Sequence, residues 1–165
     1  MLLVIAASNY LVQFPINDWL TWGAFPYPAA FLINEITNRM EGPQSAKKVV
    51  YFGFLWGAVF SFWLATPLIA IASATAFLTA QLLDIYVFNH LRKLPWWYAP
   101  FFASLGGSII DTALFWSIAF WGQPLPILTW AIGDFGVKLV LDLAFLVPFR
   151  LAIRKRPLLT LGQNQ

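Results

Sequence analysis

The chain has 165 residues, of which 60% are hydrophobic and 10% are charged, and its mean hydropathy is +0.71. Soluble domains carry about 25% charged residues, so this composition excludes a water-exposed surface and indicates a protein that lies in the lipid bilayer. The net charge of +3 is small and dispersed, which argues against a nucleic-acid partner. The absence of cysteine excludes disulfides and thiolate chemistry.

Six apolar segments follow one another, each bounded by a charge, a proline or a turn. They cover about residues 2–16, 21–39, 49–65, 67–91, 96–121 and 125–152. A membrane-spanning helix needs about 20 residues, so the last four are long enough and the first is short. The sequence therefore predicts an all-α integral membrane protein, with one domain of six transmembrane helices at 1–152 and a short basic and polar cytoplasmic tail at 153–165. The tight turn at Thr66-Pro67 predicts an antiparallel hairpin of the third and fourth helices.

The basic residues are distributed unevenly along the chain. Nine of the ten follow the second, fourth or sixth segment: Arg39, Lys47, Lys48, Arg92, Lys93, Arg150, Arg154, Lys155 and Arg156. The opposite loops, around Asp18, Thr66 and Gln123, contain none. By the positive-inside rule, both termini and the basic loops are predicted to be cytoplasmic.

The second segment, "TWGAFPYPAAFLINEITNR", combines an apolar composition with two prolines and several polar residues. Pro26 and Pro28 each lack a backbone donor and disfavour helix at the preceding residue. We therefore predict that residues 22–28 are non-helical or kinked, and that regular helix begins near Pro28. Irregular backbone at membrane depth is tolerated where it lines a cavity, and broken helices mark substrate sites in many transporters. The alternative is an interfacial re-entry above the hydrocarbon.

Ionisable and amide residues also fall inside the apolar segments. Lys138 has Asp134 and Asp142 four residues away on either side, so the three share one helix face, and Asp142 is expected to be a local partner of Lys138. Five segments contribute such groups: Asn9, Glu35, Gln81, Asp84, Asn89, Asp111, Asp134 and Lys138. A charge at the bilayer centre costs about 2.5–3.5 kcal/mol, so a shared polar cavity is the better explanation for the whole set.

A purely structural role remains the alternative for each of these residues taken singly. Asp134 and Lys138 would then only neutralise each other. Glu35 or Asp84 would then cap a cytoplasmic helix end or pair with Arg39 and Arg92.

Enzymatic motifs are missing from the sequence. It contains no Gly-rich phosphate loop, and its single histidine and lack of cysteine leave no metal-binding motif, so we expect neither an enzyme nor a cofactor. An intramembrane aspartyl protease could use Asp111 with Asp134, but only Gly133-Asp134 offers the glycine-aspartate context of such a site.

The stretches "SNYLVQFP", "TWGAFPYP" and "QLLDIYVFNHLR", followed by an Asp-Thr pair and a D-x-x-x-K spacing, resemble the queuosine precursor transporter family. The resemblance extends from about Ser8 to Pro148. It implies a six-helix bacterial inner-membrane protein that takes up 7-deazaguanine bases such as preQ0 and preQ1 for queuosine modification of tRNA. Glu35 stands where the family pattern would have aspartate, and Asp142 is outside the pattern.

The resemblance implies that substrate-binding positions fall on residues that match the family pattern: Asn9, Trp22, Gln81, Asp84, Asn89, Arg92, Asp111, Asp134 and Lys138. A 7-deazaguanine presents two donors, N1–H and the 2-amino group, beside the O6 acceptor, and a flat ring for stacking. Asp84 or Glu35 could accept both donors, and Gln81 or Asn9 could bind O6. The chain supplies stacking candidates in Trp22, Phe25 and Tyr27, and acceptors for the cationic aminomethyl group of preQ1 in Asp111 and Asp134.

Two other functions remain open at this point. The protein could be a substrate-capture subunit that works with a separate ATPase module, or, with less support, an intramembrane enzyme. The partners expected from the sequence are a small 7-deazapurine, the lipid bilayer and possible further copies of this chain in a homo-oligomer.

Overall fold

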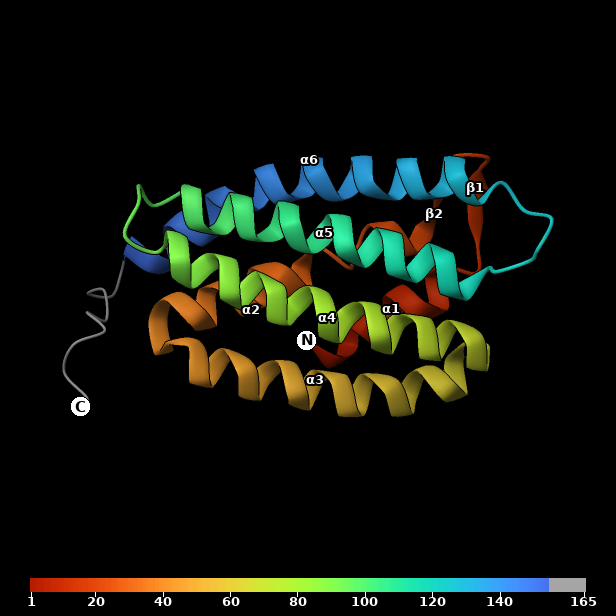
Figure 1. Ribbon diagram of the computed structural model, residues 1–165, viewed down its shortest axis with the longest axis horizontal. Coiled ribbons are helices and arrows are strands. Elements are labelled where there is room, and N and C mark those ends of the chain that lie inside the picture. Colours follow the sequence, from red (N-terminus) through yellow and green to blue (C-terminus); the bar gives the residue numbers. More distant parts are fainter. Residues whose placement is uncertain (155–165) are drawn as a thin grey trace.

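The computed structural model describes residues 1–154, which form six α-helices lying side by side along the long axis of the molecule (Figure 1). The helices are α1 (Leu2–Leu11), α2 (Ala29–Glu41), α3 (Pro43–Leu64), α4 (Pro67–Leu91), α5 (Tyr98–Ala119) and α6 (Ile127–Arg154). Between α1 and α2 lie a short antiparallel hairpin, β1 (Pro15–Asn17) and β2 (Leu20–Thr21), and the 3-10 turn η1 (Trp22–Ala24). The all-α prediction is confirmed.

Two helices of the described part of the chain, α4 and α5, combine the length and the apolar composition that a membrane-crossing helix requires. The fourth predicted segment matches α4 in full, and α4 is joined to α3 by Ala65 and Thr66 alone. Thr66 caps α4, since its Oγ1 accepts from the backbone N–H of Ile69 at 3.3 Å. The predicted α3–α4 hairpin is therefore confirmed.

The first predicted helix is wrong at its C-terminal end. The sequence indicated apolar helix to Ile16, but α1 ends at Leu11 and residues 15–21 form the hairpin. Pro15 disfavours helix at the residue before it, and the Asn17 side chain accepts from the Trp19 N–H at 2.8 Å, which stabilises the turn. The polar turn residues therefore outweigh the apolar composition.

Two further helix boundaries differ from the prediction. α3 begins at Pro43, six residues before the apolar segment at Val49, because Gly42 has a φ of +87° and Pro43 is preorganised for the first helical turn. α6 continues to Arg154, past the predicted domain boundary at 152. The rest of the predicted tail, with Lys155 and Arg156, lies outside the described residues.

Irregular backbone at the start of the second segment is as predicted. Residues 22–24 form the 3-10 turn, residues 25–28 form further turns, and α2 begins at Ala29, directly after Pro28. This connection lets the chain pass from the hairpin into the bundle interior before regular helix begins.

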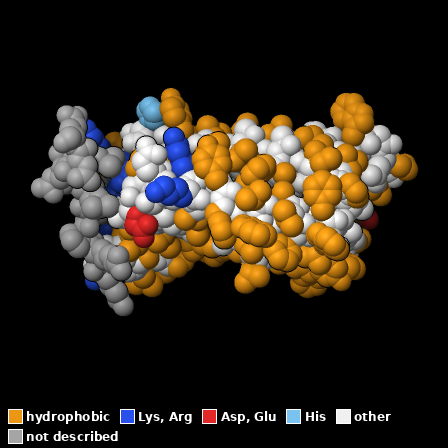
Figure 2. Space-filling view, turned by 90° about the horizontal axis from the view of Figure 1, so that it is seen from below, with side chains coloured by type: hydrophobic (Ala, Val, Ile, Leu, Met, Phe, Trp, Pro, Cys, Tyr) orange, Lys and Arg blue, Asp and Glu red, His pale blue; other side chains and the backbone are white. Residues whose placement is uncertain are grey.

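The two ends of the bundle differ in charge. The α2–α3 and α4–α5 connections and the end of α6 lie at one end, and the α3–α4 turn, the hairpin and the α5–α6 loop lie at the other (Figure 1). Seven basic residues of the described chain are at the first end: Arg39, Lys47, Lys48, Arg92, Lys93, Arg150 and Arg154. Figure 2 shows these charges gathered at one end of an otherwise largely apolar face.

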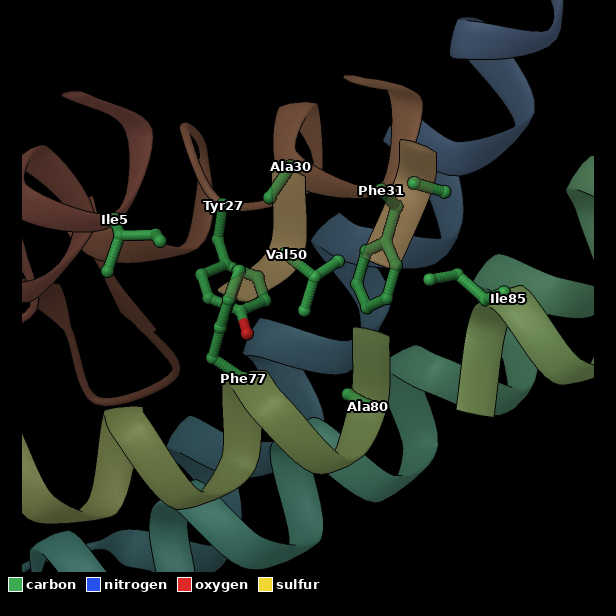
Figure 3. Packing of buried hydrophobic residues seen from close by; sticks show 9 residues of the cluster. Ile5, Tyr27, Ala30, Phe31, Val50, Phe77, Ala80 and Ile85 are labelled. Carbon is green, nitrogen blue, oxygen red and sulfur yellow. The ribbon is translucent and has the colours of Figure 1, made fainter. Parts of the chain in front are cut away.

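Apolar side chains cover both the interior and the outer surface of the bundle. One interior cluster brings together Ile5, Tyr27, Phe31, Val50 and Phe77 from the first four helices and their connections (Figure 3). The outward face of α3 exposes large apolar side chains: Phe52, Leu55, Trp56, Val59 and Trp63. An apolar exterior of this size would be costly in water and is suited to lipid.

Candidate functional site

Buried polar side chains form three layers between the helices, named here after one residue of each. The Lys138 layer lies towards the hairpin end, the Asp84 layer follows it, and the Arg92 layer lies at the basic end. Along α5, Asp111 and Ser104 are separated by about 10 Å of helix rise, which gives the spacing of the first two layers. The sequence predicted one shared cavity, whereas the structure separates the polar residues by depth.

The Lys138 layer is a closed network of charged and hydroxyl groups. The Lys138 Nζ donates to Asp134 Oδ2 at 2.5 Å, to Asp111 Oδ2 at 2.8 Å and to Thr112 Oγ1 at 3.0 Å. The Tyr27 hydroxyl donates to Asp111, and Lys138 Nζ lies 5.0 Å from the centroid of the Tyr27 ring. The predicted Asp134–Lys138 pair is thus confirmed, and Asp111 is a second partner.

The expectation that Asp142 pairs with Lys138 is wrong. Asp142 Oδ2 accepts from the Ser108 hydroxyl at 3.1 Å, and both salt bridges of Lys138 go to other carboxylates. Helical side chains lean towards the helix N-terminus, so Lys138 reaches back to Asp134 and away from Asp142. Its three ammonium hydrogens are then all used.

A small cavity adjoins the Lys138 layer. It measures about 20 Å³, enough for a single water molecule, and Ser8, Asn9, Tyr27, Ser73 and Asp111 are among its lining residues. Asn9 faces this cavity and also donates to Ser61 Oγ at 2.5 Å, which ties α1 to α3. Pockets for small-molecule ligands measure about 300 Å³ or more, so this conformation is closed to a nucleobase.

The Asp84 layer contains amide and carboxyl groups from α2 and α4. Asn34 Nδ2 donates to Asp84 Oδ1 at 2.9 Å and to the Gln81 carbonyl at 3.3 Å, so its amide lies between the two residues. Asn34, Gln81 and Asp84 have no exposed surface. The expected juxtaposition of Gln81 and Asp84, one helical turn apart on α4, is present.

Four of the six side-chain polar atoms of Asn34, Gln81 and Asp84 have no protein partner. Across residues 1–154, eight buried side-chain polar atoms lack one, and four of them belong to this layer: Asn34 Oδ1, Gln81 Oε1, Gln81 Nε2 and Asp84 Oδ2. A buried polar atom without a partner costs about 1–3 kcal/mol. Such a concentration at one depth is typical of a ligand-binding site.

Glu35 and its neighbours complete the Asp84 layer. Glu35 Oε1 accepts from the Ser104 hydroxyl at 2.6 Å, and because the preceding residue, Asn34, donates to Asp84, the Glu35 and Asp84 carboxyl groups are neighbours. Asp142 is close enough to both to interact with them electrostatically. The layer thus brings three carboxyl groups together from α2, α4 and α6.

The Arg92 layer closes the basic end of the bundle. One Arg92 nitrogen donates to the backbone and side-chain oxygens of Asn38, both at 2.6 Å, and also to Asn89 Oδ1 at 3.0 Å. Arg39 donates to the Arg92 carbonyl at 2.9 Å. Among the described residues no salt bridge joins Arg92 to Asp84 or Arg39 to Glu35, so the helix-end pairing considered for these carboxylates is wrong. The sequence predicted that Asn89 contacts the substrate; in the structure its side-chain oxygen accepts from Arg92 and so helps to position the guanidinium group.

The aromatic candidates separate into two groups. Trp22 and Phe25 are 52% and 43% exposed and face outward, away from the three layers. Among the three stacking candidates Tyr27 alone is buried, and its hydroxyl is bound to Asp111. Trp22 and Phe25 are three residues apart, which is one turn of a 3-10 helix, so both lie on the outward side of η1 and its C-cap while Gly23 and Ala24 pack inside.

Sequence reasoning missed four polar residues of the site: Asn34, Ser104, Ser108 and Thr112. The three α5 hydroxyls recur every four residues, which places them on one helix face with Asp111. That spacing alone indicates a polar face on this helix. Small hydroxyl residues also occur at ordinary helix contacts, so their carboxylate partners could not be assigned from it.

Comparison with known proteins identifies the family. The profile of a family described as "Putative vitamin uptake transporter" matches residues 56–153. The chain is 34% identical to the "Queuosine precursor transporter" of Escherichia coli strain K12, over 89% of this chain and 80% of that protein. The chain belongs to the queuosine precursor transporter family.

Two further proteins with related names are also similar in sequence to this chain. The "Probable queuosine precursor transporter" of Haemophilus influenzae is 34% identical over 88% of this chain and 79% of its own length. The protein of the same name from Bacillus subtilis is 25% identical over 62% of this chain and 57% of its own length. No solved structure matches the chain. The names of these relatives describe transport, in agreement with the expectation that the protein is not an enzyme.

Proposed function

We propose that this protein imports 7-deazaguanine bases, such as preQ0 and preQ1, across the bacterial inner membrane to supply queuosine modification of tRNA. The relatives' names support this substrate class. The single observation that carries it to this chain is the group of four unpartnered polar atoms on Asn34, Gln81 and Asp84.

The unpartnered atoms are complementary to the edge of a 7-deazaguanine. Asp84 Oδ2 is a charged acceptor for N1–H or the 2-amino group, and Asn34 Oδ1 or Gln81 Oε1 can accept the remaining hydrogen. Gln81 Nε2 is a donor for O6. Phe31, buried one helical turn before Glu35, offers a ring face at this depth. The base would thereby satisfy the groups that the folded chain leaves without partners.

A bundle of six helices embedded in the membrane, with its basic end in the cytoplasm, completes the proposal. Its support is the concentration of basic residues at one end of the bundle and the apolar exterior of the face in Figure 2. α1 is only 10 residues long, and Met1 lies beside Gly53, midway along α3. The contacts of Ile5 with Gly57 and of Asn9 with Ser61 show that α1 runs parallel to α3, so its first residue is directed towards the basic end.

Transport requires the Asp84 layer to open alternately to the two sides. The Lys138 layer separates it from the hairpin end, and the Arg92 layer separates it from the basic end. Both flanking layers are held by hydrogen bonds between different helices, which can break and re-form when helices move. The closed arrangement described here corresponds to an occluded carrier.

Binding of preQ0 to purified Asp84→Asn protein tests the assignment. The substitution places a donor or a neutral acceptor where the base presents donors, and removes a charge-assisted hydrogen bond worth about 1.5–3 kcal/mol. Affinity measured by calorimetry is expected to fall by about ten- to a hundredfold. An unchanged affinity in folded protein would exclude Asp84 as the base-reading carboxylate.

Asp142→Asn is the matched control. It removes another buried carboxylate close by, but the Asn oxygen can still accept from Ser108, and we assign this residue no contact with the base. Its affinity for preQ0 is expected to stay within a factor of about three of wild type, a difference below 1 kcal/mol. Equal losses in the two variants would point to a general effect of charge.

A further inference from the structure

The Asp84 layer holds more negative charge than the proposed base recognition needs. Glu35, Asp84 and Asp142 are 3%, 0% and 4% exposed and come from three helices. Both salt bridges in residues 1–154 involve Lys138, and neither reaches these three carboxyl groups. Several buried carboxylates without a cation would be far too costly, so a positive charge must reach this layer.

The geometry of the Glu35–Asp84 pair identifies that charge as a proton. Both residues are buried, and Asn34, the residue before Glu35, donates to Asp84 at 2.9 Å, so the two carboxyl groups are close neighbours; a hydrogen bond between them requires that one of them carries a hydrogen. Two ionised carboxylates at this separation repel strongly, so the pair shares one proton. A metal ion is a poorer candidate, because the described residues contain no group of three or more acidic or histidine side chains arranged to hold one.

The charged groups around the pair do not replace the proton. On the α6 side, Asp142 adds negative charge, and Lys138 is occupied by Asp111 and Asp134. α5 contributes the Ser104 and Ser108 hydroxyls. Towards the basic end, the guanidinium groups of Arg39 and Arg92 donate to Asn38, Asn89 and a backbone carbonyl. α3 packs here through Ala46 and Val50, which are apolar.

We infer that Glu35 is a proton-binding site that couples base transport to the proton gradient, an inference that rests on the proposed function. Protonated Glu35 donates to one oxygen of Asp84, and the free Asp84 Oδ2 accepts from the base. The Ser104 hydroxyl occupies the other oxygen of Glu35. Because the base needs the ionised form of Asp84, its binding keeps the shared proton on Glu35, and in this scheme proton and base enter together and are released together to the cytoplasm. Each ligand strengthens the binding of the other.

Purified protein in liposomes tests this coupling with radiolabelled preQ0, which carries no charge of its own. With an external pH one unit below the internal pH, one proton per base predicts accumulation to about tenfold above the outside concentration. Glu35→Gln is expected to lose this accumulation and only equilibrate the base. It should keep exchange of internal for external base at equal pH, because Gln can still donate a hydrogen to Asp84.

The controls separate the coupling from transport itself. Asp142→Asn is expected to keep the tenfold accumulation. If Asp142→Asn loses accumulation and Glu35→Gln keeps it, the assignment of the proton to Glu35 is overturned. If wild-type protein exchanges base but does not respond to the gradient, the coupling is wrong and the transport function stands. Absence of exchange by wild-type protein would instead count against the proposed function.

A measurement on wild-type protein alone covers the case in which Glu35→Gln does not fold. A pH-sensitive dye inside the vesicles should report acidification of the lumen when preQ0 is added outside at equal pH. The expected ratio is about one proton per base taken up, as the shared proton of the pair implies. Entry of labelled base without acidification would overturn the inference.

Discussion

Replacement of Lys138 by methionine should be one of the most damaging single changes in the bundle. The side chain is 2% exposed, and its ammonium group contacts Asp111 at 2.8 Å and Asp134 at 2.5 Å. Methionine fills a similar volume but leaves two buried carboxylates without a cation. Removing one partner of a buried ion pair costs about 3–5 kcal/mol, and here two carboxylates lose their partner.

The expected loss converts into a measurable change in thermal stability. One kcal/mol shifts Tm by about 2–4 °C in a chain of this size, so Lys138→Met should lower Tm by about 6–20 °C. The tryptophan fluorescence of detergent-purified protein provides the measurement. Lys93→Met, at an exposed position of the basic end, is the control and should leave Tm nearly unchanged.

Compensating changes distinguish loss of charge balance from loss of packing. Adding Asp134→Asn to Lys138→Met leaves a single carboxylate, Asp111, which keeps the Tyr27 hydroxyl, and should recover part of the loss. Adding Asp111→Asn as well leaves no charge in the layer and should recover most of it. If the triple variant is no more stable than Lys138→Met, the charge-balance explanation is refuted.

Two further predictions concern topology and packing. Because the chain has no cysteine, a single cysteine can be introduced at Gln123 in one variant and at Gln44 in another. An impermeant thiol reagent applied outside intact cells should label the cysteine at Gln123 and not the one at Gln44. The reverse labelling would mean that the orientation in the membrane is inverted. A Cβ at Gly107 would lie 2.5 Å from the Phe31 ring and 3.3 Å from the Ala80 carbonyl. Gly107→Val should therefore cost about 1–3 kcal/mol of stability. Gly106→Val, where a Cβ meets nothing within 4 Å, should lower Tm much less in the same thermal assay.

The helices were largely predictable because the lipid-facing residues must be apolar and because proline and charge mark the ends. α4 matched its segment in full, and the start of α2 followed from Pro28. The hairpin was not predictable from composition, since its residues are as apolar as a helix and the turn depends on the Asn17 side chain. The early start of α3 was missed because its first turns contain the polar residues Lys47 and Lys48, which the search for apolar segments excluded.

The buried charged residues of the candidate site were predictable from the sequence, but their pairing was not. Residues four apart on one helix could be matched, and Asp134 with Lys138 is the example. The pairing of Asp111 with Lys138 joins residues 27 apart in sequence and depends on how α5 and α6 are rotated against each other. Sequence spacing within one helix does not determine that rotation, so it also misassigned Asp142, whose partner Ser108 lies 34 residues away.

The three layers explain why the second segment tolerates residues that are costly in lipid. Its prolines fall where the backbone is already non-helical, so α2 loses no internal hydrogen bond to them. Four polar side chains of the segment point at a partner from another helix: Tyr27 at Asp111, Asn34 at Asp84, Glu35 at Ser104 and Asn38 at Arg92. Asn38 lies four residues after Asn34 and three after Glu35, so these three side chains lie on one side of α2, and Tyr27 precedes Asn34 by seven residues. The second segment thus contributes to all three layers, and among the described residues the layer assigned here to base and proton has the most side-chain atoms without a partner.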